Sequence, residues 1–209
     1  MNSPVTAASF EQPDSFAFTA ENLDRAEAHI AKYPPGRQAS AVLPLLWIAQ
    51  EQCGGWLPRA AMDHVAQILG MPPIRVYEVG TFYTMFNLRP VGRYLLQVCT
   101  TTPCWLCGSD AVVEACKKKL GIGVSGTTPD GLFTLVEVEC LGACVNAPIL
   151  QVNDDFYEDL DSPTTEALLD ALRDGKAPPP GSVTGRQGSE PVTGRTTLIK
   201  PAAEPGGQE

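Results

Sequence analysis

Cysteines are the residues of this chain whose type and spacing could carry chemistry. Five of the seven form two clusters, with Cys99, Cys104 and Cys107 in the first and Cys140 and Cys144 in the second. In a reducing compartment, clustered cysteines indicate metal ligands or redox groups sooner than structural disulfides. The two clusters are therefore the first candidates for a functional site.

The spacing of four of these cysteines favours an iron–sulfur cluster. Four residues separate Cys99 from Cys104, three separate Cys140 from Cys144, and 35 lie between the two pairs. Each pair follows a predicted strand, so the four thiolates converge if the strands are parallel neighbours in one sheet. Each iron of a binuclear cluster takes two cysteine sulfurs. The small residue Gly142 would also let a backbone N–H group approach the sulfurs of the second pair.

Two other interpretations use the same residues. Four cysteines could hold a structural zinc ion, whose ligand pairs are usually separated by about two to four residues in a tight turn. The two pairs fit that pattern only marginally, and the spacing favours the cluster. Cys104 and Cys107 also form a CxxC sequence, which near a βαβ pattern can indicate a thioredoxin-like disulfide. Because Cys104 cannot serve both sites, we predict that Cys107 is a neighbour of the cluster and not a ligand.

No other pattern in the chain indicates a catalytic site. Cys116 lies on the apolar face of a predicted helix and Cys53 at a helix end, so both are expected to be structural. The chain contains no P-loop, G-x-G-x-x-G or Ser-His-Asp pattern, and His29 and His64 are expected at the surface. The chain therefore has no predicted site of its own for NADH or flavin, and an electron carrier of this kind needs partners.

The first part of the chain is predicted to form a small helical bundle. Residues 1–18 are polar and are expected to be a flexible arm. Apolar periodicity and Gly or Pro breaks then predict four short helices within residues 19–90, ending near Ile30, Cys53, Leu69 and Phe82. Short connections between helices of this length are typical of a bundle.

The second part is predicted to be a small α/β domain over residues 91–176. Strands are expected at 94–100 and 132–139, a hairpin over 149–158, and helices at 109–120 and 162–173. The order β-α-β-β-α, with a parallel crossover first, predicts a small α/β sandwich. Residues 177–209 are rich in Pro and Gly and lack apolar periodicity, so we expect a flexible tail or a strap that orders against a partner.

Composition excludes several classes of function. The formal net charge of −9 argues against a nucleic-acid partner and against attraction to an anionic membrane surface. The longest apolar run, residues 41–49, is far shorter than the roughly 20 residues that span a bilayer. The N-terminal residues lack the features of a signal or transit peptide. We expect a cytoplasmic chain with no direct membrane insertion, and a trimmed mitochondrial matrix form is the alternative.

Three long stretches give the chain a family resemblance. Glu78–Phe86 (EVGTFYTMF), Val98–Cys104 (VCTTTPC) and Glu139–Pro148 (ECLGACVNAP) resemble the 24-kDa thioredoxin-like 2Fe–2S subunit family of respiratory complex I, part of its NADH dehydrogenase module. The resemblance runs from about residue 20 to residue 174. The stretches are long and in the expected order, so the resemblance decides for the cluster over zinc.

The resemblance implies a fold, a cofactor and partners. It implies a helical bundle followed by a thioredoxin-like ferredoxin domain with one [2Fe–2S] cluster, whose ligands are Cys99, Cys104, Cys140 and Cys144. The implied partner is a larger iron–sulfur subunit that binds FMN and NADH, together with other peripheral-arm subunits. The cluster would lie near the FMN and carry one electron at a time from NADH oxidation, in a complex peripheral to the inner membrane that passes electrons to quinone.

Other complexes use similar subunits, and the chain departs from the family pattern at two positions. NAD-linked hydrogenases and formate dehydrogenases contain such subunits, whereas a stand-alone ferredoxin would not need the helical bundle. Gly80 stands where Ala is expected, which costs the helix about 1 kcal/mol, and Cys107 stands where a residue other than cysteine is expected. Thioredoxin-like folds commonly place a cis-proline before an inner strand, so Pro148 is predicted to be cis although X–Pro bonds generally favour trans.

Overall fold

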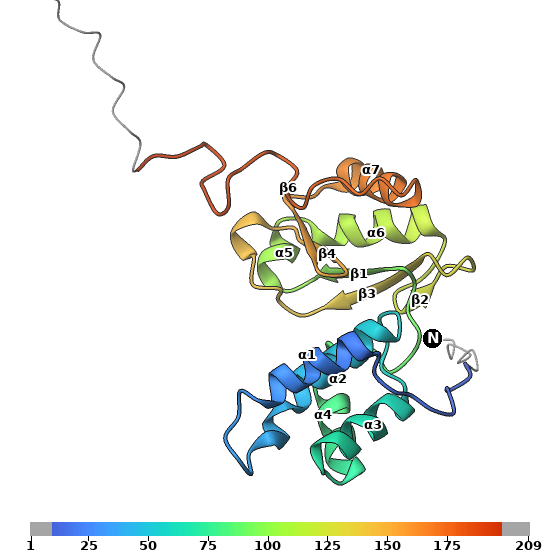
Figure 1. The fold of residues 1–209 in the computed structure, drawn as a ribbon. Coiled ribbons are helices and arrows are strands. Elements are labelled where there is room, and N and C mark those ends of the chain that lie inside the picture. The colour runs from blue at the N-terminus through green and yellow to red at the C-terminus, as the bar shows by residue number, and fades with distance from the viewer. Residues whose placement is uncertain (1–9, 198–209) are drawn as a thin grey trace, which may run out of the picture. The chain divides into compact units, whose positions relative to one another are not determined.

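The structure, a computed structural model, describes residues 10–197 of the chain. The chain divides into two compact units, Met1–Arg93 and Tyr94–Glu209 (Figure 1). The expectations for residues 1–9 and 198–209 lie outside the described residues. No helix among the described residues is long and apolar enough to cross a membrane.

The first unit consists of four α-helices and one short 3-10 helix. Their bounds are α1 Ala20–Ile30, η1 Gln38–Ala41, α2 Val42–Gln52, α3 Arg59–Leu69 and α4 Pro73–Phe82. These are the four helices that the sequence predicts, and the residues directly before the second one form η1. Gly70 ends α3 in the left-handed conformation at φ 61°, which glycine adopts without steric cost. Fully buried side chains such as Leu45, Leu46 and Val65 form the core of this unit.

Residues 10–18 make defined contacts with the helices of the first unit. The Phe16 and Phe18 rings meet His64 edge to face, at centroid distances of 5.5 and 5.4 Å. Gln52 accepts hydrogen bonds from the Thr19 backbone and the Asn22 amide, and it donates one to the Ala17 carbonyl at 2.8 Å. The described half of the expected flexible arm is therefore attached to the helices through two aromatic side chains.

The second unit is a six-stranded mixed sheet with helices. Its elements are β1 Tyr94–Cys99, α5 Thr102–Leu106, α6 Ser109–Leu120, β2 Gly126–Thr127, β3 Phe133–Val138, η2 Cys144–Asn146, β4 Leu150–Val152, β5 Asp155–Glu158, α7 Ser162–Arg173 and β6 Gly181–Ser182. The strand order is β2-β3-β1-β4-β5-β6. The α/β thioredoxin-like fold predicted from the sequence is confirmed, and the short elements β2, α5, η2 and β6 are additions to it.

The central strand pair sets the direction in which both cysteine loops leave the sheet. β1 and β3 are parallel, in a register that runs from Tyr94 opposite Phe133 to Cys99 opposite Val138. The parallel pairing predicted for these strands is thus confirmed. Because the two strands end at the same edge, the segments that follow them start side by side.

Packing between the sheet and two helices gives the second unit its core. α6 and α7 contact each other and cover one face of the sheet (Figure 1). Buried side chains of the strands, among them Leu96, Leu135 and Tyr157, meet Val112 and Leu169 of these helices. The capping box at Asp161, whose carboxylate accepts from the Thr164 amide at 2.9 Å, fixes where α7 begins.

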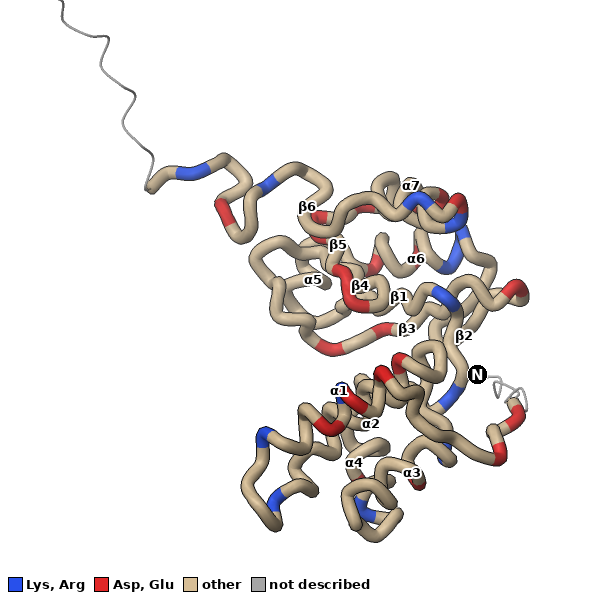
Figure 2. The backbone as a smooth tube through the Cα atoms, viewed as in Figure 1, with Lys and Arg blue, Asp and Glu red and all other residues tan. Residues whose placement is uncertain are grey.

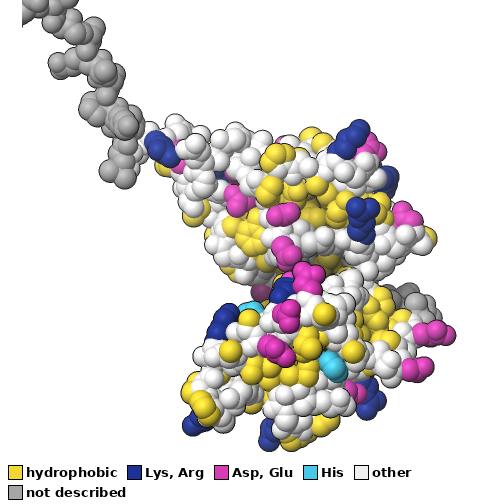
Figure 3. Space-filling model, viewed as in Figure 1, with side chains coloured by type: hydrophobic (Ala, Val, Ile, Leu, Met, Phe, Trp, Pro, Cys, Tyr) yellow, Lys and Arg dark blue, Asp and Glu magenta, His cyan; other side chains and the backbone are white. Residues whose placement is uncertain are grey.

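Charged residues are distributed over both units (Figure 2). Basic residues end α6, where Lys117, Lys118 and Lys119 occupy the last turn and complement the helix dipole. On the face drawn in Figure 3, apolar side chains lie between the charged ones. Several large apolar side chains are exposed in each unit, and those nearest the cysteines are described below.

Replacing Gly80 with Ala is expected to raise the free energy of unfolding by about 0.5–1 kcal/mol, because Ala favours a helix interior over Gly by that amount. A Cβ at this position would lie 2.9 Å from the Met62 sulfur, but a methionine side chain is flexible enough to move. The measurement is urea denaturation followed by circular dichroism. Gly70→Ala is the control and is expected to destabilise, because Gly70 has φ 61°. A destabilised Gly80→Ala would mean that Met62 is held rigidly.

Candidate functional site

The first cysteine pair lies where β1 passes into the short helix α5. Cys99 is the last residue of β1, and Cys104 lies in α5. The sequence predicts a loop here; the structure forms a five-residue helix, with Pro103 in its first turn, where the missing N–H costs nothing. Both thiols are about 1% exposed. The Thr101 hydroxyl lies 3.1 Å from the Cys99 sulfur.

The second pair lies in the loop between β3 and β4. The Cys140 and Cys144 sulfurs are 3.3 Å apart. Gly142, at φ 83°, lets the chain turn back between them. Its backbone N–H donates to the Cys140 sulfur at 3.4 Å. The role expected of this glycine, an N–H group brought close to sulfur, is confirmed by that contact.

Charges on thiols of one pair affect the pKa values of thiols in the other pair. Burial and the hydrogen bond with Cys99 raise the pKa of Cys104 to about 12, and the charges of Cys99 and Cys144 add to this. Burial also acts to raise the pKa of Cys99, but hydrogen bonds from Thr101 outweigh it and the net pKa is lowered. The charge of Cys99 also acts to raise the pKa of Cys140. Cys99 is therefore within electrostatic reach of both thiols of the second pair, and Cys104 is within reach of Cys144.

Within the second pair, too, the pKa values of the two thiols are shifted in opposite directions. The Gly142 N–H bond lowers the pKa of Cys140, while the hydrogen bond with Cys140 raises the pKa of Cys144. Each pair thus contains one thiol with a pKa below its ordinary value and one with a pKa above it. Since metal ligation needs all four as thiolates, binding iron to these residues would release protons.

The donor set fits a binuclear cluster. It consists of two cysteine pairs at adjoining strand ends, with backbone N–H bonds to the sulfurs of Cys99, Cys104 and Cys140. Among residues 10–197, no group of three or more His, Cys, Asp or Glu side chains is placed so that it could hold a metal ion. A [2Fe–2S] cluster takes one cysteine pair on each iron, and hydrogen bonds to its sulfurs tune the reduction potential.

The remaining cysteines are placed differently. Cys107 is exposed at the C-terminal end of α5, Cys116 is fully buried in the core of the second unit, and Cys53 is half-buried in the first. The structural role expected of Cys116 agrees with this burial. The predicted cis peptide bond before Pro148 is confirmed.

Cys116 is expected to resist alkylation in the folded chain. Burial raises its pKa to about 12, and the thiolate is the reactive form. With iodoacetamide at neutral pH, peptide mapping is expected to show labelling at least about a hundredfold slower than for an unperturbed thiol. Exposed Cys107 is expected to label readily, and both should label equally in urea. Rapid labelling of native Cys116 would show that α6 opens.

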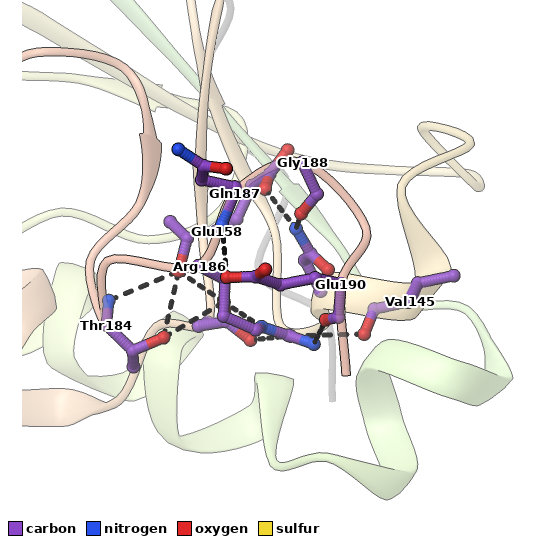
Figure 4. A network of polar contacts seen from close by, with 10 residues as sticks. Val145, Glu158, Thr184, Arg186, Gln187, Gly188 and Glu190 are labelled. Atoms are coloured by element: carbon purple, nitrogen blue, oxygen red, sulfur yellow. Dashed lines mark hydrogen bonds and ion pairs between the residues drawn. The ribbon is translucent and has the colours of Figure 1, made fainter. Parts of the chain in front are cut away.

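Several residues around the site were not predicted from the sequence. Trp105, Leu106 and Val145 lie beside the cysteine ligand candidates in the chain and are 55%, 72% and 64% exposed. Their positions next to cysteines were visible, but nothing in the sequence showed that they face outward. Arg186 was missed as well. Its side chain reaches the loop that carries Cys144 (Figure 4).

A sequence signal for Arg186 does exist. The tetrapeptide VTGR occurs twice, at 183–186 and 192–195, in the segment expected to be a flexible tail or a strap. The structure gives the two arginines different surroundings. The Arg186 side chain is 7% exposed and paired with Asp159, whereas the Arg195 side chain is 59% exposed.

Comparisons with known proteins agree with this geometry. Residues 26–173 match the family described as thioredoxin-like [2Fe-2S] ferredoxin. The chain is 53% identical over 190 residues to NADH dehydrogenase [ubiquinone] flavoprotein 2, mitochondrial, of Dictyostelium discoideum, a match that covers 91% of this chain and 77% of that protein. It is 58% identical over 159 residues to an NADH-quinone oxidoreductase subunit of Rickettsia bellii, a match that covers 76% of this chain and 95% of that protein.

A solved structure shares the fold at much lower identity. The match is to the crystal structure of an NAD+-reducing [NiFe]-hydrogenase in the air-oxidized state, with a TM-score of 0.55 and 21% identity. It covers 63% of this chain and 23% of that chain. The chain described here belongs to the thioredoxin-like [2Fe-2S] ferredoxin family and carries one [2Fe–2S] cluster.

Proposed function

We propose that this chain is a one-electron carrier subunit of an NADH:quinone oxidoreductase, with Cys99, Cys104, Cys140 and Cys144 as the four ligands of its [2Fe–2S] cluster. The observation that carries the proposal is the placement of two cysteine pairs at the adjoining ends of parallel strands. The high identity to subunits named for NADH dehydrogenase and NADH-quinone oxidoreductase supports the same assignment.

The residues of this chain hold the cluster and control its surroundings. When bound, the cluster takes up and releases one electron. Ile149, which is 1% exposed, and the partly buried Leu141 and Ala143 pack around Cys99 and Cys104 and exclude water from that side. Backbone N–H groups such as that of Gly142 stabilise negative charge on the sulfurs.

The chain needs a partner that supplies the electron. The proposed partner is a larger iron–sulfur subunit that binds FMN and NADH, in the peripheral part of the complex, with bacterial cytoplasm favoured over the mitochondrial matrix as its location. The cluster is proposed to lie near the FMN. Exposed Trp105 and Leu106 of α5 and Val145 of η2 form an apolar surface around the cysteines that is suited to such a contact.

The second candidate for the complex that contains this subunit is an NAD-linked hydrogenase. The shared fold with the NAD+-reducing [NiFe]-hydrogenase favours it, but that match has only 21% identity. The matches to the NADH dehydrogenase and NADH-quinone oxidoreductase subunits have sequence identities of 53% and 58%. Sequence similarity therefore favours the quinone-reducing complex.

The test is reduction of the cluster by NADH in the complex. The full chain is co-purified with its FMN-binding partner and treated anaerobically with excess NADH, and electron paramagnetic resonance (EPR) is recorded at low temperature. A binuclear signal is expected in the complex and not in this chain alone, since only the partner has a nucleotide site. The absence of that signal in a complex whose flavin is fully reduced would contradict the proposed electron path.

A further inference from the structure

A buried ion pair joins the C-terminal segment to the rest of the second unit. Arg186 donates to both carboxylate oxygens of Asp159, with Nε to Oδ2 at 2.9 Å. The two side chains are 7% and 10% exposed. The Ser182 hydroxyl also donates to Oδ2 of Asp159, at 2.6 Å. The carboxylate is therefore surrounded by donors from residues 182–186.

The charge state of this pair is well defined. Burial acts to raise the pKa of Asp159, but the hydrogen bonds from Arg186 and Ser182 and the charge of Arg186 outweigh it, so the pKa lies below its ordinary value. Asp159 has φ 58°, a conformation that Asp tolerates better than most residues. A charged, bidentate pair of this kind has high directional specificity.

The same guanidinium reaches the loop that carries Cys144. Nη2 of Arg186 donates to the carbonyl of Val145 at 3.2 Å, and Nη1 donates to the carbonyl of Glu190 at 3.1 Å (Figure 4). Val145 directly follows Cys144. One side chain thus links Asp159, the C-terminal segment and the cysteine loop.

A second contact holds the next residue of that loop. The Asn146 amide nitrogen donates to the Gly188 carbonyl at 2.7 Å and to the Glu158 carboxylate at 2.6 Å. The Asp159 N–H donates to the Asn146 carbonyl at 2.7 Å. Both residues after Cys144 are therefore fixed from the C-terminal segment, and Asn146 is only 4% exposed.

We propose that Arg186, fixed by Asp159, is a positioning residue that holds the Cys144 loop in place for the [2Fe–2S] cluster. The C-terminal segment 181–190 then acts as a strap within the chain, and the geometry and electrostatic environment of the Cys144 thiolate depend on it. This inference rests on the proposed function, because it takes Cys144 as a ligand. Arg195, in the second VTGR copy, bonds only to Glu190 and Gln187 among the described residues and does not reach the loop.

The first readout needs no cluster. Amide hydrogen exchange of Asn146 and Ala147, whose N–H groups are bonded within the turn, is measured in the cluster-free full chain. In Arg186→Ala, exchange is expected to be at least about tenfold faster, because a charge-assisted bond is lost. Asp159→Asn keeps the shape and the backbone preference but not the charge, so it is expected to accelerate exchange even if Arg186→Ala folds poorly. Arg195→Ala, the matched control, is expected to leave exchange unchanged.

The second readout is the reduction potential of the reconstituted cluster. Arg186→Ala leaves the Asp159 carboxylate without its partner, so the potential is expected to fall, since negative charge nearby disfavours reduction. Arg195→Ala is expected to keep the wild-type potential. Wild-type exchange in both Arg186→Ala and Asp159→Asn, or an unchanged potential in Arg186→Ala, would overturn the proposal. Failure of the wild-type chain to take up the cluster would instead contradict the proposed function, and the exchange comparison would still test the strap.

Discussion

Replacing Cys140 with Ala is expected to abolish the [2Fe–2S] cluster, taking iron content from about two atoms per chain to near zero. Loss of one thiolate leaves one iron with an incomplete ligand set. Cys140 is exposed, so the replacement removes little packing, and the circular dichroism spectrum is expected to stay that of the wild type. Iron and acid-labile sulfide analysis of the anaerobically purified chain gives the measurement.

Cys107→Ala is the matched control for this prediction. Cys107 is also exposed and lies only three residues after Cys104, yet we expect its loss to leave the cluster intact. Loss of iron in Cys107→Ala would contradict the ligand assignment and revive the CxxC interpretation. Retention of two irons in Cys140→Ala would show that another group, such as Cys107, can replace the ligand.

Replacing Phe133 with Ala is expected to lower the free energy of unfolding by about 3–5 kcal/mol. Phe133 is fully buried at the start of β3 and stacks on Tyr94 with ring centroids 5.6 Å apart. The two residues are also opposite each other in the parallel β1–β3 pair. Removing the ring therefore leaves a cavity at the strand pair that directs both cysteine loops.

Phe82→Ala removes the same side chain from an exposed position. Phe82 is 76% exposed, so its replacement is expected to change stability by less than about 0.5 kcal/mol. Urea denaturation followed by circular dichroism compares the two variants with the wild type. A similar decrease in the free energy of unfolding in both variants would mean that Phe82 is more tightly packed than its exposure indicates. A small decrease in Phe133→Ala would show that neighbouring side chains move in to fill the cavity.

The parts of the fold that could be predicted are those with local signals. The four helices of the first unit have apolar periodicity and clear boundary residues: Gly70 ends α3 and Pro73 begins α4, each through its own backbone preference. The parallel pairing of β1 and β3 followed from a strand–helix–strand order, and the cysteine pairs from their spacing. Each of these signals lies within a short stretch of sequence.

The parts that could not be predicted depend on contacts distant in sequence. α5 has five residues, too few for periodicity to show, and it begins where Pro103 sits in a first turn. Arg186 finds Asp159 across 27 positions, and β6 has only two residues, Gly181 and Ser182. Pro and Gly content predicted a flexible tail or a strap that orders against a partner, because composition does not show which single side chains find a buried partner within the chain.

Low-temperature EPR of the full chain, purified anaerobically and reduced with dithionite, tests the presence of the cluster directly when metals are analysed in the same sample. A rhombic signal from a binuclear cluster and about two irons per chain are expected. Zinc in place of iron, with no binuclear signal, would contradict the assignment of a [2Fe–2S] cluster.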